Sequence, residues 1–225
     1  MKANLPCGAA VLNAMASVVL AMLVFGCASK TVLVPVPPRI DLRSYDAIGV
    51  IDFAPESADK LGQTATQQFM SAIHVSQPGV RFLELGPMDR LLWQAHRERV
   101  DPETTKTFGT QHKVDSVFTG TYEVSESNPQ VSVDKDLGSV RTSTRVRMSL
   151  TVRQWDTKSG ATIWTKTHHG EWSVAKVRVQ AGQSVGVRVS DPRERYGEFM
   201  EQLVRAVTSD FAVQYERRPI AKLQD

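Results

Sequence analysis

The chain has 225 residues, with 27 Lys and Arg against 24 Asp and Glu, so its formal net charge is +3. An apolar content of 41% is enough to bury a core and argues against a fully disordered chain. The small net charge indicates neither a nucleic-acid binder nor a binder of acidic substrates. Two cysteines exclude a disulfide-rich scaffold.

The first 26 residues have the pattern of a secretory signal peptide. A short basic start is followed by an apolar stretch over residues 8–25, and the small residue Gly26 precedes Cys27. This end resembles a bacterial lipobox, with Val24 at its aliphatic position. The resemblance implies cleavage between Gly26 and Cys27, a diacylglycerol thioether on the Cys27 sulfur, and an acyl chain on the new amino group.

Two alternatives to the lipoprotein interpretation stay open. An uncleaved stretch of ~18 apolar residues is at the short end of what spans a bilayer. A plain signal peptide with an incidental cysteine is the other alternative. Ala28 and Ser29 follow the cysteine, and in a Gram-negative lipoprotein the absence of Asp there implies transfer to the outer membrane. Apart from the lipid on Cys27 we expect no cofactor.

Residues 27–39 contain Cys27 and a proline-rich segment. Pro35, Pro37 and Pro38 predict a polyproline II tether. At ~3.1 Å per residue, about twelve residues reach somewhat under 40 Å. After this tether we predict one periplasmic domain over residues 40–217 and a tail over residues 218–225.

Strand and helix signals alternate along this domain, which favours the α/β class with a mixed β-sheet flanked by helices. The strongest strand signal is the alternation of residues 145–153, and the strongest helix signal is the apolar stripe between Pro192 and Phe211. The other predicted strands cover residues 45–53, 80–85, 116–124 and 161–167, and further helices begin near Ser57, Pro87 and Asp101.

The order of these segments is similar to that of a family of periplasmic lipoprotein domains. The segments AIGVIDF, RFLELG, HKVDSVFTGTYE and VRMSLTVRQWDTKSGATIWTK resemble the curli-channel CsgG type, the TolB amino-terminal domain and the LpoB activator domain. The resemblance covers roughly residues 45–170 and the final helix. It implies a role in envelope assembly and no catalytic residues.

Two segments depart from this pattern. Residues 125–142 are polar and rich in turn formers, and residues 175–190 alternate around a predicted turn at Gly182. Lys176, Arg178 and Arg188 share one side of the second segment and are candidate partner contacts. In the curli channel, matching insertions span the membrane, but here each arm offers about six residues where a spanning strand needs ~9–11. We expect projecting hairpins that pack on the domain or contact a partner.

The sequence contains no motif that indicates an enzyme. Five histidines form no zinc-binding spacing, and neither a nucleophile elbow nor a nucleotide-binding loop is found. His168 and His169 would point to opposite faces of a strand. We therefore predict a non-enzymatic binding or scaffold protein of cell-wall synthesis, secretion or surface-organelle assembly. We expect it to contact an envelope protein or its own copies, and neither nucleic acid nor a small-molecule substrate. The alternatives are a subunit of a CsgG-like secretion channel and a hydrolase without a recognisable motif.

Overall fold

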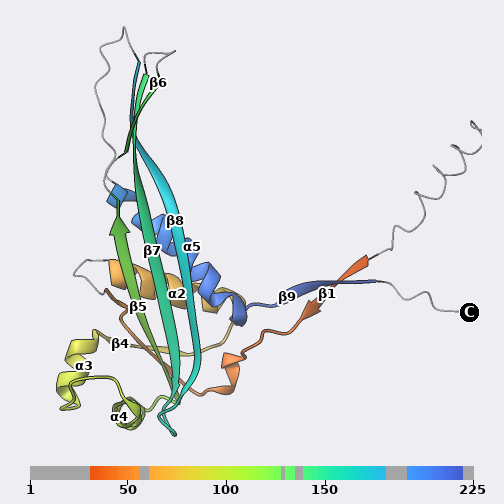
Figure 1. Cartoon of the computed structure of the whole chain (residues 1–225). Coiled ribbons are helices and arrows are strands. Elements are labelled where there is room, and N and C mark those ends of the chain that lie inside the picture. Colours follow the sequence, from red (N-terminus) through yellow and green to blue (C-terminus); the bar gives the residue numbers. More distant parts are fainter. Residues whose placement is uncertain (1–30, 56–60, 128–129, 135–138, 181–191, 220–225) are drawn as a thin grey trace, which may run out of the picture. The chain divides into compact units, whose positions relative to one another are not determined.

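A computed structural model describes residues 31–55, 61–127, 130–134, 139–180 and 192–219 (Figure 1). The chain forms two compact units, one over Pro37–Val213 and one made by the two terminal segments. Within the described ranges, no helix is both long and apolar enough to cross a membrane.

The unit Pro37–Val213 is built on a mixed β-sheet. The strand order is β4-β2-β5-β7, with β8 on the far side of β7, and β6 pairs with β7 beyond the end of β5. Strands β2, β4 and β5 are parallel, whereas β5, β7 and β8 are antiparallel. This arrangement confirms the predicted class. The bounds are β2 Ile48–Ile51, β3 Ala54–Pro55, β4 Phe82–Gly86, β5 Ser116–Glu126, β6 Gln130–Asp134, β7 Ser139–Asp156 and β8 Thr162–Gln180.

Helices cover both faces of the parallel part of the sheet. Helices α2 (Leu61–Ser76) and α5 (Tyr196–Val207) share the larger core with Val50 and Phe118. Helices α3 (Met88–Gln94) and α4 (Pro102–His112) share a smaller core with Ile51 and Val117. Successive residues of a strand point to opposite faces, so neighbouring residues of β2 and of β5 belong to different cores.

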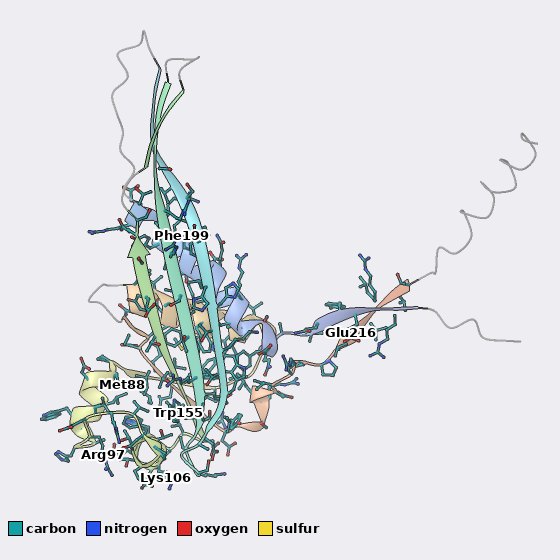
Figure 2. The ribbon with its side chains drawn as sticks, in the orientation of Figure 1. Met88, Arg97, Lys106, Trp155, Phe199 and Glu216 are labelled. Atoms are coloured by element: carbon teal, nitrogen blue, oxygen red, sulfur yellow. The ribbon has the colours of Figure 1, made fainter. Side chains whose placement is uncertain are left out.

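Local sequence signals set the start of α4 and the buried face of α5. Asp101 caps α4, because its carboxylate accepts a hydrogen bond from the Thr104 backbone N–H at 2.8 Å, and Pro102 takes the first position. The predicted stripe of α5 is buried and includes Phe199 (marked in Figure 2). The Phe199 ring stacks on Trp172 of β8, with ring centroids 4.5 Å apart. The chain also has two short 3₁₀ turns, Leu42–Ser44 (η1) and Pro192–Arg195 (η2). The η1 turn precedes β2, and the η2 turn directly precedes α5.

Strands β7 and β8 have 18 and 19 residues and are much longer than predicted. Residues 175–180, predicted as the first arm of a separate hairpin, continue β8 and pair with the start of β7. The second predicted arm and the turn at Gly182 lie outside the described residues. At this end of the sheet, Val133 of β6 and Val179 of β8 are both register partners of Val140 in β7.

A buried glutamine ties together the two chain ends of the unit Pro37–Val213. The Gln77 side chain accepts a hydrogen bond from the Leu42 N–H at 2.7 Å. Its amide N–H₂ donates to the carbonyl oxygens of Ile40 at 2.6 Å and Phe211 at 2.9 Å. The chain segments that continue beyond these ends therefore start close together.

Asp210 in the 3₁₀ turn Thr208–Phe211 (η3) ties this turn to β8. Its carboxylate accepts hydrogen bonds from Trp164 Nε1 at 3.2 Å and Lys166 Nζ at 2.9 Å. Burial opposes ionisation of Asp210, but the hydrogen bonds from Lys166 and Trp164 outweigh it, so the pKa of this carboxyl is lowered.

The terminal unit is an antiparallel pair of strands, β1 (Thr31–Val36) and β9 (Gln214–Pro219). Residues 31–36 are therefore a β-strand and not the polyproline II segment that the prolines predicted. Both conformations are extended, and β9 supplies hydrogen-bond partners that polyproline II lacks. Because β9 is almost the whole chain away in sequence, no local pattern indicates this pairing.

Candidate interaction surface

Strand β8 is an edge of the large sheet. Its register with β7 runs from Thr162 to Gln180, and no other described strand pairs with it. An unpaired strand side presents a row of backbone N–H and C=O groups. Because β8 has 19 residues, and a usual strand has about 5–6, this row is long. The outer side of β8 can accept another extended segment by strand addition.

The edge adjoins a polar face of the sheet. Figure 1 shows α2 and α5 on one side of β5, β7 and β8. On the opposite side, Thr121, Thr151 and Thr167 form one register row, and the hydroxyls of Thr151 and Thr167 are 2.8 Å apart. Glu123 and His169 are exposed in the next row. We call this surface, together with the outer side of β8, the β8 surface.

Charged side chains cross the β8 surface. Glu171 lies between two arginines of β7, with N···O distances of 2.9 Å to Arg145 and 3.0 Å to Arg147. A cavity of about 380 Å³ beside them is lined by Glu123, Arg147, His169 and Glu171. Exposed ion pairs contribute only ~0–1 kcal/mol to stability. These charges can therefore exchange their present partners for those of a bound protein at small cost.

A second accessible surface lies between α2 and β4. Val75 is 82% exposed and Leu83 is 43% exposed. Met70, His74 and Phe82 line the same trough of about 740 Å³. Its apolar lining fits a hydrophobic side chain, but the described residues give no indication of what covers it.

The residues predicted as sites are only partly described. Lys176 and Arg178 lie on β8, where Arg178 pairs in register with Arg141 and the register shifts by one residue at Lys176. The β8 strand thus continues the edge to these two predicted contact residues. Arg188, Gly26 and Cys27 lie outside the described residues. Contact with a partner and lipidation both stay predictions.

The histidines of β8 diverge as predicted for a strand. His168 is the register partner of Leu150 and His169 that of Ser149, so they belong to opposite faces. In the described part of the chain, no group of three or more His, Cys, Asp or Glu has a metal-binding arrangement. The sequence did not predict the β8 surface, because the lengths of β7 and β8 were underestimated. The available signal was the alternation of the β-branched residues Val140, Thr142 and Thr144 with Ser and Arg.

Comparisons with known proteins give likenesses of structure only. No protein-family model matches the chain, and no curated protein matches it. Among solved structures, the PelC dodecamer from Paraburkholderia phytofirmans is 16% identical, with coverage of 82% of this chain and 99% of that chain and a TM-score of 0.40. Lipoprotein GNA1162 from Neisseria meningitidis is 17% identical over 72% of this chain and 94% of that chain, with a TM-score of 0.34.

The LpoB C-terminal domain from Salmonella enterica is also similar. It is 10% identical, with coverage of 69% of this chain and 94% of that chain and a TM-score of 0.34. The order of sequence segments predicted a likeness to LpoB, CsgG and TolB; the comparisons include LpoB, and the resemblance to CsgG and TolB stays a prediction. At these identities and TM-scores, the likenesses carry no argument about function or partners.

Proposed function

We propose that this chain is a lipoprotein of the bacterial envelope, attached to the outer membrane through lipid on Cys27, with its α/β unit in the periplasm. Its role in this proposal is non-enzymatic: it binds another envelope protein, or its own copies, during envelope assembly. The lipobox-like sequence before Cys27 supports the anchor.

The unpaired side of β8 is the observation on which the binding role rests. An edge of 19 residues, with register shifts at two places, offers main-chain hydrogen bonds for affinity. The exposed side chains Glu171, His169 and Thr167 next to it offer polar contacts for selectivity. Native proteins usually cover or shorten such an edge, so an extended segment of a partner protein is the occupant that fits it.

Site-specific photo-crosslinking in cells tests the binding role. A photoreactive residue at Thr167 or His169 of the full chain should give covalent adducts with one envelope protein or with a second copy. The control is Thr110, which is exposed on α4, a helix outside the sheet. Adducts that are equally frequent at all three positions, or absent from β8 in a stably anchored chain, would refute strand addition at β8.

The anchor is tested separately by Cys27→Ser. We expect this variant to leave the membrane fraction, because serine cannot carry the lipid. In the wild type, three acyl chains exceed the roughly two signals that stable anchoring requires. Mass spectrometry of the wild-type chain should find the modified Cys27 at its amino terminus. An intact Met1, or a Cys27→Ser chain that stays in the membrane fraction, contradicts the anchor.

A channel subunit is the second candidate, and the tip of the sheet favours it. Val133, Val140 and Val179 fall in one register row across three strands, and Ser132, Arg141 and Arg178 fall in the next. Such alternation suits strands with one apolar and one polar environment. Beyond the end of β5, β6 has five described residues, β7 has seven (139–145) and β8 has eight (173–180), against ~9–11 for a spanning strand. Ring-shaped particles with conductance in planar bilayers would support this candidate, and a non-conducting monomer would remove it.

A further inference from the structure

The β1–β9 pair lacks the features that normally stabilise strands. No third described strand pairs with it, and none of its residues with described side chains is buried. An isolated two-stranded ribbon is marginally stable in water. Leu33 and Tyr215 nevertheless remain 60% and 65% exposed. The ribbon therefore has a surface that a further contact would stabilise.

The register gives the two faces of the ribbon different chemistry. Leu33 pairs with Arg217, and Pro35 pairs with Tyr215, so these four residues share one face. This face, which we call the Leu33 face, combines an aliphatic, an aromatic and a basic side chain. Among the described residues, Arg217 has no acidic partner.

On the opposite face of the ribbon, the positive charge of the arginine is balanced by a glutamate. Val32 pairs with Arg218 in the register, and Arg218 forms an ion pair of 3.3 Å with Glu216 on the same strand (Glu216 is marked in Figure 2). The two arginines are consecutive residues of β9, but in the described part of the chain only Arg218 forms an ion pair, so Arg217 binds an external anion without giving up a partner.

The position of the ribbon along the chain identifies the anion. Thr31 is four residues after Cys27, and a chain extends at most ~3.6 Å per residue, so β1 begins within roughly 14 Å of a lipid on Cys27. Pro219 pairs with Thr31, which places Arg217 near the same end of the ribbon. If Cys27 is anchored as proposed above, the Leu33 face is held beside the headgroups of that membrane.

We propose that the Leu33 face lies on the membrane surface, with Arg217 bound to lipid phosphate and Leu33 and Tyr215 in the interfacial layer. Arg pairs well with phosphate, and Tyr is enriched at membrane interfaces. A second copy fits this face less well, because a symmetric contact would bring two Arg217 side chains together. Pro35 also removes a backbone donor from β1, which disfavours addition of another strand.

Depth-dependent fluorescence quenching tests the contact in the full lipidated chain. The chain is reconstituted in vesicles of phosphatidylethanolamine and phosphatidylglycerol that contain a brominated lipid. Leu33→Cys and the matched control Val32→Cys each supply one thiol for a fluorophore, because lipidation blocks Cys27. We expect strong quenching of the label at position 33 and weak quenching at position 32. Equal quenching at both positions, or none at either in vesicles that carry the protein, overturns the proposal.

Charge variants give a second, independent measurement. Each Arg near an anionic surface strengthens membrane binding about fivefold. In the quenching experiment, Arg217→Gln should therefore lower the ratio of membrane-bound to detached ribbon about fivefold. Arg218→Gln removes the same charge from the opposite face and should have much less effect. Equal effects of the two variants overturn the proposal.

This inference rests on the proposed anchor, and the experiment distinguishes the two. Vesicles that float without the wild-type chain show that the anchor itself is wrong. Vesicles that carry the chain but leave the Leu33 label unquenched show that the anchor is present and the ribbon contact is wrong.

Discussion

Replacement of Gln77 by leucine is the sharpest test of how the unit Pro37–Val213 is held closed. Gln77 is 2% exposed and makes three hydrogen bonds to the backbone of two distant segments. Leucine fills a similar volume but can neither donate nor accept. The variant therefore leaves the Leu42 N–H and the carbonyls of Ile40 and Phe211 without this partner.

The expected loss of stability follows from these three groups. An unsatisfied buried polar group costs ~1–3 kcal/mol. The Ile40 bond is only partly buried, and each carbonyl keeps a second lone pair. The free energy of unfolding should therefore fall by about 3–5 kcal/mol, out of a typical ~5–15 kcal/mol for a domain.

Urea unfolding followed by circular dichroism measures the effect. Gln67→Leu is the matched control, since Gln67 is exposed on α2, the helix that ends just before Gln77, and its replacement should cost less than ~0.5 kcal/mol. Gln77→Glu keeps an acceptor for Leu42 but turns a carboxylate oxygen toward two carbonyls, so we expect it also to destabilise. If the free energy of unfolding of Gln77→Leu is within about 1 kcal/mol of the wild-type value, the hydrogen bonds of Gln77 do not hold the unit closed.

Two further changes test the contacts of β5 and β8. Because the pKa of Asp210 is lowered in the fold, its stabilising effect is full above the unfolded pKa of about 3.9 and is lost as the pH falls through the folded value. Asp210→Asn should reduce the acid sensitivity of unfolding below about pH 4, and an unchanged pH profile would contradict the role of the Lys166 contact. A Cβ at Gly120 would lie 2.4 Å from the Phe53 ring, so Gly120→Ala should cost about 1–3 kcal/mol in urea unfolding. Gly197→Ala is the control, because a Cβ there meets nothing within 4 Å, and equal stability of the two variants would refute the steric argument.

Local sequence signals predicted the class of fold because they act over a few residues. The cap at Asp101, the stripe of α5 and the alternation around Leu150 are each complete within one element. The β1–β9 pair and the hydrogen bonds of Gln77 depend on partners from distant parts of the chain. A single glutamine at the end of a helix carries no pattern that would identify Ile40 or Phe211 as its partners.

In β8, one extra residue changes the register that the local alternation of residues would predict. Residues 175–180 do alternate, as predicted, but the register shifts by one residue at Lys176, so Val177 pairs with Thr142 and not with its neighbour. This shift places Val177 and Val179 in the same series of register rows as Trp172, whose ring stacks on Phe199 of α5. Without the shift, the valines would fall in the series of rows that contains Arg145 and Glu171. The bulge therefore keeps these two valines in the series of rows that contains Trp172, while β8 continues past the core to Gln180.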